Sequence, residues 1–281
     1  MKSTPEKYYL TEVDRINDSI YCHHDLMGEL FIPAHSHKKA QFLYTEGGIV
    51  YVKTAFKTYF LPARHFMWIP AGVTHSIHPS SPNVVMRNLY FPVEKSESEF
   101  YRVEGIYPAN DLLLHLLLFT HKWNGDIIKI EKENYTIVKA LQLLLPQICL
   151  VRLGLSLPQP QDDRLQKIVD YMWKNLQESL LFSVVAQQFG FSERSLHRLF
   201  RKDMGMSFIQ FYTIQRILKA LSLLLEHKFT VNEVARKVGY SSVPTFSNTF
   251  YKIMGQRPSE YITGVEILNK PADYSASLFK V

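Results

Sequence analysis

The chain has 281 residues and a net charge of +6, and 46% of its residues are hydrophobic, 21% charged and 13% aromatic. This is the composition of a globular protein with enough residues for two or three small cores. No stretch approaches 18 uninterrupted apolar residues, and the N-terminus lacks an apolar segment behind a basic start, so we expect neither insertion into a membrane nor a secretory signal. Two cysteines without metal-type spacing, Cys22 and Cys149, favour reduced thiols and a cytoplasmic location.

The excess positive charge lies entirely in the last third of the chain. Residues 163–264 contain 14 Lys and Arg and 8 Asp and Glu. Their net charge of +6 equals the net charge of the whole chain. The remaining residues are therefore balanced. A basic segment of this kind indicates an anionic partner, either a nucleic acid or a membrane surface.

The predicted elements fall into five segments along the chain. Residues 1–95 are rich in Tyr, Phe, Val and Thr in short runs cut by Pro and Gly, which predicts strands of an antiparallel barrel or sandwich. Residues 96–151 contain two predicted helices, at 110–121 and 131–150. Two Pro and one Gly make residues 152–163 a predicted linker. The pattern is helical over residues 164–264, and residues 265–281 are expected to form a tail.

The strongest signal in the sequence is an internal repeat. The equivalent pairs are Ala186 and Ala235, Gly190 and Gly239, and Phe191 and Tyr240, each 49 residues apart, and then Phe200 and Phe250, Gly205 and Gly255, and Phe211 and Tyr261, each 50 apart. A unit of about fifty residues used twice is one supersecondary structure repeated.

Each repeat is predicted to form a helix, a tight turn and a second helix. Gly190 and Gly239 suit the left-handed turns that end short helices. Ser192 is the expected N-cap of the helix that follows in the first repeat, and Ser241 or Ser242 that of its equivalent. This is the layout of a helix-turn-helix, whose second helix enters the major groove of DNA. An apolar helix of about 19 residues connects the two units and spans roughly 28 Å, against roughly 34 Å between successive major grooves.

Residues 164–264 resemble the AraC/XylS family of transcription regulators. The resemblance rests on Ala186, Gly190 and Phe191, on the segment 195–224 that follows them, on Glu233 to Tyr240, and on FYKIMGQRPSEYI at 250–262. It implies a regulator, not an enzyme, that binds double-stranded DNA sequence-specifically, responds to a small-molecule effector and forms a homodimer. RNA polymerase is a further partner that the resemblance allows.

The residues expected to contact DNA lie on the second helix of each repeat. On the first, the exposed donors that share one face are Arg194, His197, Arg198 and Arg201. The equivalent face of the second shows Thr245, Ser247, Asn248, Tyr251 and Lys252. The family often has Arg or Lys near Asn248 and Tyr251, and here only Lys252 remains nearby. We therefore expect the first helix to carry more of the specificity. The alternative is a solvated basic face without base contacts.

A second resemblance lies in the N-terminal part. His35-Ser-His37, then Gln41, and later His75 after Pro70-Ala-Gly72 are similar to the two conserved strips of the cupin barrel. The resemblance implies that His35, His37, Gln41 and His75 would bind a divalent transition metal. Gln41 replaces the usual acid, and Arg64 replaces a glycine.

Two readings of these side chains other than a metal site stay open. They would line an effector pocket, together with Tyr44, Tyr51 and Trp68. Alternatively, the histidines are structural groups at the mouth of the barrel.

The helix at 131–150 has an apolar stripe at helical spacing, formed by Ile137, Leu141, Leu144 and Leu145. The family resemblance implies dimerisation here, and packing on the chain's own barrel is the alternative. The expected fold class is therefore α+β: a cupin-like β-barrel, a helical dimerisation segment and an all-α domain with two helix-turn-helix units.

Two other functions remain open from the sequence. One is a metal-dependent cupin enzyme with an appended basic domain. The other is an architectural DNA binder with little sequence preference. The sequence contains no Gly-rich phosphate loop, nucleophile elbow or convincing catalytic triad, which weighs against the enzyme.

Overall fold

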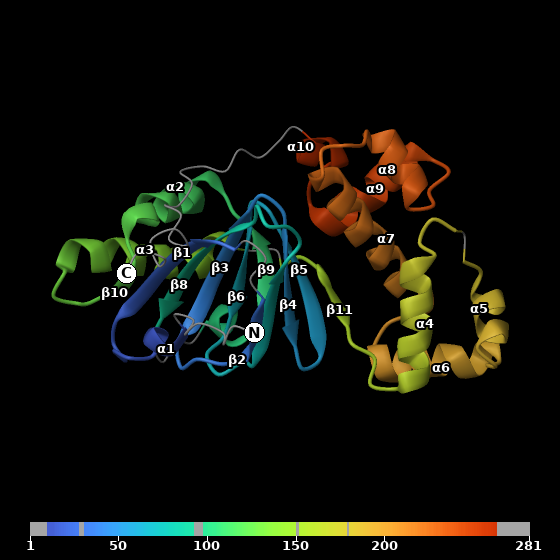
Figure 1. Ribbon diagram of the computed structural model, residues 1–281, viewed down its shortest axis with the longest axis horizontal. Coiled ribbons are helices and arrows are strands. Elements are labelled where there is room, and N and C mark those ends of the chain that lie inside the picture. The colour runs from blue at the N-terminus through green and yellow to red at the C-terminus, as the bar shows by residue number, and fades with distance from the viewer. Residues whose placement is uncertain (1–9, 28–30, 93–97, 150–151, 179, 263–281) are drawn as a thin grey trace, which may run out of the picture. The chain divides into compact units, whose positions relative to one another are not determined.

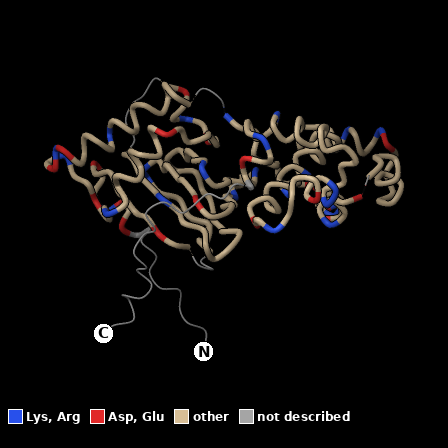
Figure 2. The backbone as a smooth tube through the Cα atoms, turned by 90° about the horizontal axis from the view of Figure 1, so that it is seen from above, with Lys and Arg blue, Asp and Glu red and all other residues tan. Residues whose placement is uncertain are grey.

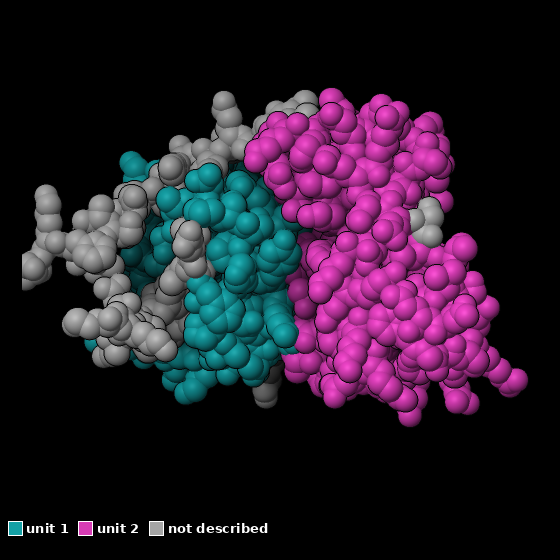
Figure 3. All heavy atoms as spheres, turned by 45° about the vertical axis from the view of Figure 1, so that its right-hand side comes forward, with its two compact units in different colours: residues 1–54, 61–153, 265–281 teal, residues 55–60, 154–264 magenta. Residues whose placement is uncertain are grey.

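The structure is a computed structural model that describes residues 10–27, 31–92, 98–149, 152–178 and 180–262. The described residues form two compact units (Figure 3). One contains the described residues up to Thr54 and within Leu61–Leu153, and the other contains Ala55–Phe60 and the described residues of Gly154–Gly264. The first is built mainly of strands and the second mainly of helices (Figure 1), which confirms the α+β fold class. The expected tail at 265–281 lies outside the described residues.

The strands form two sheets in which the neighbouring strands described here run antiparallel, as predicted. The six-stranded sheet has the order β10-β1-β8-β3-β6-β9 and the five-stranded sheet the order β11-β5-β4-β7-β2. The strands of the first are β1 (Ile20–Leu26), β3 (Ala40–Glu46), β6 (His65–Ile69), β8 (Val85–Phe91), β9 (Gly105–Pro108) and β10 (Gly125–Ile127). Those of the second are β2 (Ile32–His35), β4 (Ile49–Thr54), β5 (Lys57–Pro62), β7 (His75–Pro79) and β11 (Ser156–Pro158).

Two helices, α2 (Asp111–Phe119) and α3 (Lys132–Ile148), cover one face of the six-stranded sheet (Figure 1). Alternate strand residues point to this face because side chains in a strand alternate between its two sides. The buried residues that form this core include Cys22, Phe42, Tyr44, Phe66, Trp68, Leu89, Phe91, Leu113, Leu117, Val138, Leu141 and Leu145. The short helices of this unit are α1 (Leu10–Val13), η1 (Glu99–Arg102) and η2 (Thr120–Lys122).

The segment 96–151 is not a separate helical domain, contrary to the expected boundary at residue 95. Its strand β9 pairs with β6, and β10 pairs with β1, so both complete the six-stranded sheet. Likewise, part of the expected linker 152–163 is a strand, β11, which pairs with β5. The strands β9 and β10 are short and lack a strong alternation of apolar and polar residues, so the sequence pattern did not predict them.

The apolar stripe of α3 faces largely inward. Leu141 and Leu145 are buried in the core between α3 and the sheet, and Ile137 and Leu144 are half-buried. Packing on the chain's own sheet therefore accounts for much of the stripe. Leu143, on another side of the same helix, is 55% exposed.

The helical unit contains both predicted helix-turn-helix motifs. Its helices are α4 (Asp163–Lys174), α5 (Phe182–Gln188), α6 (Glu193–Met204), α7 (Phe208–Leu225), α8 (Val231–Lys237), α9 (Val243–Met254) and α10 (Pro258–Ile262). Ser192 and Ser242 cap α6 and α9, each accepting a hydrogen bond from the backbone N–H three residues later. Gly190 and Gly239 have φ of +72° and +77° in the two turns, as predicted.

Helix α7 is the core of this unit and links the two motifs (Figure 1). Its 18 residues span about 27 Å. By length and composition alone, it is the one described helix that meets the test for a membrane span, yet 56% of it is buried inside the protein. Because its apolar side chains already pack against the helices of both motifs, the helix serves the core of a globular domain.

Candidate DNA-binding surface and effector site

The first surface predicted to contact DNA, here called the first reading surface, is the solvent-facing side of α6. Leu196, Phe200 and Met204 recur every four residues and are buried, which fixes the opposite side of the helix outward. The four residues predicted to contact DNA, Arg194, His197, Arg198 and Arg201, are all exposed there. Lys and Arg are distributed along the helical unit (Figure 2). The side of α6 that faces away from its own core is therefore rich in hydrogen-bond donors.

The second reading surface lies on α9 and is fixed in the same way. Phe246, Phe250 and Met254 are buried, and they turn the remaining side of the helix outward. Of the predicted contacts, Thr245, Asn248, Tyr251 and Lys252 are exposed and Ser247 is half-buried.

One cation on this second surface was missed by sequence reasoning. Arg257 follows the turn at Gly255 and returns beside the helix, where its Nη1 donates a hydrogen bond to Asn248 Oδ1 at 3.0 Å. Its guanidinium carbon lies 4.7 Å from the centre of the Tyr251 ring. The expectation that only Lys252 provides positive charge near Asn248 and Tyr251 is therefore wrong. The nine-residue separation from Asn248 gives no helical periodicity, so no pattern within α9 would have revealed it.

The second site is a cluster of histidines inside the β-sandwich. β2 and the connection after it bring His35 and His37 together with His75 at the start of β7, and ligand atoms of the three rings lie within 4.8 Å of one another. Gln41 of β3 joins them, because its Oε1 lies 3.2 Å from His37 Nε2 and 3.1 Å from His75 Nε2. All four predicted metal ligands are thus neighbours in space.

Backbone carbonyls fix the tautomer of each ring. The Nδ1 atoms of His35, His37 and His75 lie within hydrogen-bond distance of carbonyl oxygens of Pro33, Lys39 and Val73. A carbonyl only accepts, so each Nδ1 carries the proton and each Nε2 of the neutral ring presents a lone pair. Three electron-pair donors therefore converge on one place, which is the donor set that divalent transition metals prefer.

Burial keeps these rings neutral. Burial, followed by the nearby His35, lowers the pKa of His75 to about 3, and burial also lowers the pKa of His35 and His37. Neutral imidazole is the form that binds a metal. Close to neutral pH the cluster is thus a set of hydrogen-bond and metal acceptors rather than a positive patch.

The Gln41 amide decides which ligand the cluster suits. Its Nε2 donates to Asn88 Oδ1 at 2.8 Å and to Tyr90 Oη at 3.1 Å, which turns Oε1 toward the rings. In this orientation Gln41 Oε1 faces the Nε2 atoms of His37 and His75, and all three atoms are acceptors. A cation bound by the three atoms would remove their mutual repulsion. Rotating the amides of Gln41 and Asn88 instead lets Gln41 donate to the rings of His37 and His75, and these two rings are then satisfied without a metal, whereas the buried Nε2 of His35 has no hydrogen-bond partner among the described residues in either orientation.

Asn88 and Tyr90 of β8 were not predicted as part of this site. No motif surrounds them, and they join it because β8 pairs with β3 in the register that sets Tyr90 opposite Gln41. Only knowledge of strand pairing would have found them.

Three predicted effector residues do not face the cluster. Tyr44 and Trp68 point to the opposite side of their sheet, into the core under α2 and α3, and the Trp68 Nε1 donates to the Tyr101 carbonyl. Tyr51 lies beside His78, with ring centres 6.2 Å apart, on the other side of its sheet from His75. The expectation that these three side chains line the same pocket as the histidines is wrong.

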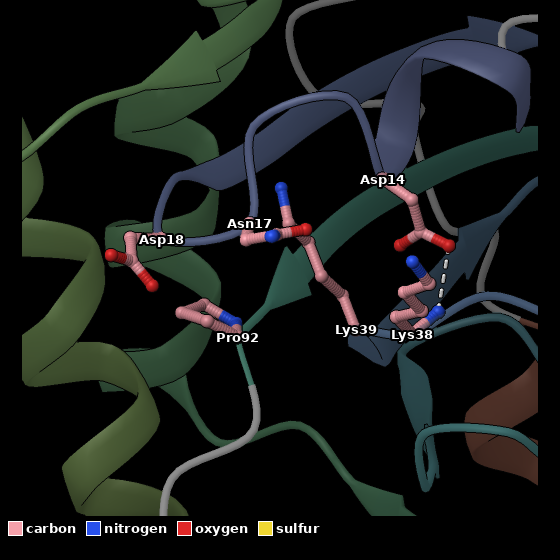
Figure 4. A pocket seen from close by; sticks show the side chains of 6 residues that line it. All are labelled: Asp14, Asn17, Asp18, Lys38, Lys39 and Pro92. Atoms are coloured by element: carbon pink, nitrogen blue, oxygen red, sulfur yellow. Dashed lines mark hydrogen bonds between the residues drawn. The ribbon is translucent and has the colours of Figure 1, made fainter.

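The same unit also contains a polar cavity of about 270 Å³ (Figure 4). It is lined by Asp14, Asn17, Asp18, Lys38, Lys39 and Pro92. Lys39 is buried, and its Nζ donates to Ser19 Oγ at 2.8 Å and lies 3.7 Å from Asp126. The backbone N–H of Lys38 donates to Asp14. Because the Lys39 ammonium and the Asp14 carboxylate already have partners within the protein, the cavity is a weaker candidate site than the cluster.

Comparison with known proteins identifies the chain. Residues 18–117 match the AraC-like ligand binding domain, and residues 185–264 match a helix-turn-helix domain. The HTH-type transcriptional regulator NimR of Escherichia coli K12 is 28% identical over 253 residues, which cover 89% of this chain and 90% of that protein. The chain belongs to the AraC family of transcription regulators.

Other members match over shorter stretches. The arabinose operon regulatory protein of Escherichia coli K12 is 34% identical over 127 residues, less than half of either chain. The DNA-binding domain of AdpA, solved with a target DNA, is 28% identical, covers 36% of this chain and 92% of that one, and has a TM-score of 0.35.

Membership in the AraC family decides between the functions left open by the sequence. The chain is a DNA-binding transcription regulator with a small-molecule-binding domain, and its relatives are transcription regulators rather than enzymes. The reading of a cupin enzyme with an appended basic domain is therefore set aside.

Proposed function

We propose that this AraC family regulator reads two neighbouring major grooves of double-stranded DNA with α6 and α9, and that an effector bound at the histidine cluster changes this reading. The supporting observation is that the equivalent helices of a fifty-residue repeat each turn a polar face to solvent and are joined by one helix of 18 residues. Its length of about 27 Å is close to the roughly 34 Å between successive major grooves.

The contacts on α6 contribute most of the affinity in this proposal. Arg194, His197, Arg198 and Arg201 are exposed donors on one helix, and an arginine can bond bidentately to guanine. On α9, Thr245, Ser247, Tyr251 and Lys252 position the helix on the phosphate backbone, and Asn248 faces the bases.

The effector contacts His35, His37, Gln41 and His75. Since each Nε2 offers a lone pair, the ligand brings either a positive charge or N–H and O–H donors. A divalent transition metal held by the same four residues would supply that charge and would attract an oxygen-bearing effector. The effector shifts DNA binding only if it binds one conformation of the chain better than another.

We further propose that the regulator acts as a cytoplasmic homodimer. The exposed Leu143 of α3 and Leu112 of α2 supply apolar surface for a second copy. A dimer has four reading helices, suits paired half-sites and meets RNA polymerase at the promoter.

Effector response is tested with the operator that the protein selects from random DNA. Binding to it is titrated with and without a bacterial small-molecule extract, for the wild type and for His75→Ala. We expect the extract to change the affinity of the wild type and not that of the variant. If the extract still changes the DNA affinity of His75→Ala, the effector does not bind at the histidine cluster.

A further inference from the structure

We propose that Arg257 and Asn248 form a preorganised binding site for the major-groove edge of guanine, so that the second helix-turn-helix reads a base through a residue that lies outside its recognition helix. This inference rests on the proposed function, in which α9 enters the major groove. It adds a specificity-determining residue and the chemical class of its ligand.

Two contacts hold the Arg257 side chain in place on the exposed side of α9. Its Nη1 donates to Asn248 Oδ1 at 3.0 Å, and its guanidinium lies over the Tyr251 ring at 4.7 Å. Asn248 and Tyr251 are three residues apart on α9 and lie on the same side of the helix. Arg257, Asn248 and Tyr251 are all exposed, so this arrangement is available to a ligand.

The backbone around Arg257 is fixed as well. Gly255 ends α9 with φ of +74°, which reverses the chain direction, and the Arg257 N–H donates to Glu260 Oε1 at 2.7 Å at the start of α10. The next residue, Pro258, is buried. The side chain therefore leaves a rigid corner, and little conformational entropy is lost when it binds.

The hydrogen-bond polarity of the pair selects its ligand. A guanidinium has only donors, so Asn248 must turn its Oδ1 toward Arg257 and its Nδ2 away. Asparagine recognises adenine by accepting and donating together, and here its acceptor oxygen already accepts a hydrogen bond from Arg257 and is turned toward that side chain. The guanidinium and the amide N–H groups together form a donor-only surface. Guanine presents two acceptors, O6 and N7, on its major-groove edge, and thus complements this surface.

A phosphate would be a less suitable ligand for this pair. Lys252 is exposed on the same helix and provides a charge for the backbone without any fixed geometry. A planar guanidinium held by stacking and by a hydrogen bond instead has the fixed orientation that bidentate base contacts require.

The test is selection from a random duplex library by the full-length wild type and by Arg257→Ala, Arg257→Lys and Lys252→Ala. We expect the wild type to select guanine at one position of the block read by α9. Arg257→Ala should reduce the preference for guanine there by about 5- to 150-fold and leave the block read by α6 intact. Arg257→Lys should keep the positive charge but lose most of this preference. Lys252→Ala, at a proposed phosphate contact, should weaken binding to all sequences about equally and keep the preference for guanine.

Two results would overturn the inference. One is an equal loss of affinity of Arg257→Ala for all sequences with a smaller salt dependence, which marks a phosphate contact. The other is an unchanged preference in Arg257→Ala. Both differ from a failure of the proposed function, in which the wild type itself selects no two-block motif. The Arg257 N–H that bonds Glu260 belongs to the backbone, so the alanine variant keeps that corner of the fold.

Discussion

The guanidinium of Arg216 lies 3.9 Å from the centre of the Tyr240 ring, which fixes a side chain of the connecting helix α7 against the turn of the second helix-turn-helix. The Nε of Arg216 also donates to the Val238 carbonyl in that turn. On its other side, the guanidinium lies 5.4 Å from the ring of Tyr212, whose hydroxyl donates to the Glu178 carbonyl just before the first motif. Arg216 therefore fixes α7 against the turn of the second motif and is linked, through Tyr212, to the segment before the first motif.

The first prediction uses the two equivalent turn glycines. A Cβ on Gly239 would meet Arg216 Nη2 and the Leu176 carbonyl at 2.9 Å, whereas a Cβ on Gly190 would meet nothing within 4 Å. Both have positive φ, so each alanine has a backbone cost of about 1 to 2 kcal/mol. We expect Gly190→Ala to show only this cost and Gly239→Ala to lower the free energy of unfolding by about 3 kcal/mol or more. Urea unfolding measures both, and equal losses would mean that Arg216 and the Leu176 carbonyl do not pack closely against the second turn.

The second prediction concerns Arg216 itself. Replacing it with alanine removes a charged hydrogen bond and a cation–π contact, and should lower the free energy of unfolding by about 2 kcal/mol. It should also relax the preference for one spacing between the two blocks of the operator. Lys167→Ala, on the exposed side of α4, is the control. A variant that loses stability but keeps the strict spacing would leave Arg216 with a purely structural role.

The third prediction compares the two reading helices. Arg198→Ala removes a charged donor from α6, and Asn248→Ala removes a neutral amide from α9. Fluorescence anisotropy with the selected operator should show a larger loss of affinity for Arg198→Ala. Greater loss from Asn248→Ala would reverse the assigned order of the two helices.

The fourth prediction tests the metal at Gln41. Gln41→Glu places a carboxylate beside the Nε2 atoms of His37 and His75 and should raise the affinity for Co²⁺ or Zn²⁺ roughly tenfold or more. Titration with Co²⁺, followed by its visible absorption, measures the affinity of each protein. If neither protein binds metal in the presence of excess ion, the cluster is not a metal site. The Gln41 amide is then in the rotated orientation, in which it donates to the histidine rings.

The fifth prediction concerns pH and two buried histidines outside the cluster. Burial lowers the pKa of His24 to about 3 and that of His65 to about 4, whereas unfolded histidine titrates near 6.5. Below pH 6.5 the unfolded state binds protons that the folded state does not, so the free energy of unfolding falls with pH. The fall should be about 1.4 kcal/mol per pH unit for each histidine, down to about pH 4 for His65 and pH 3 for His24.

His65→Gln should remove one part of this dependence. Between pH 6 and pH 4.5, the free energy of unfolding of the variant should fall less steeply than that of the wild type. Urea unfolding at each pH measures this free energy. His115→Gln, at an exposed position of α2, is the matched control. An unchanged slope in His65→Gln would show that His65 is not buried in its neutral form.

The sequence predicted the local features of the helical unit because caps, glycine turns and helical spacing act within a few residues. Ser192, Gly190 and Gly239 are where those rules require them. The four cluster residues were also predicted, through short motifs. The misplaced residues were Tyr44, Trp68 and Tyr51, and the alternation of side chains along a strand accounts for the error. Gln41 and Tyr44 of β3 are three residues apart, so their side chains point to opposite sides of the sheet.

What the sequence could not supply was pairing between distant segments. Tyr90 reaches Gln41 only through the register of β8 and β3, and Arg257 reaches Asn248 only because the chain reverses at Gly255. Both relationships depend on tertiary structure, whereas propensity and periodicity describe neighbours along one element.

The most direct test of the central claim is selection of duplex DNA from a random library by the purified full-length protein at physiological salt. If α6 and α9 enter neighbouring major grooves, the selected motif spans about 17 to 20 base pairs and has two informative blocks roughly 10 base pairs apart, one for each helix. Binding without an enriched motif, both alone and with small-molecule extract added, and with an affinity that falls steeply with salt, would contradict this claim and mark an architectural DNA binder.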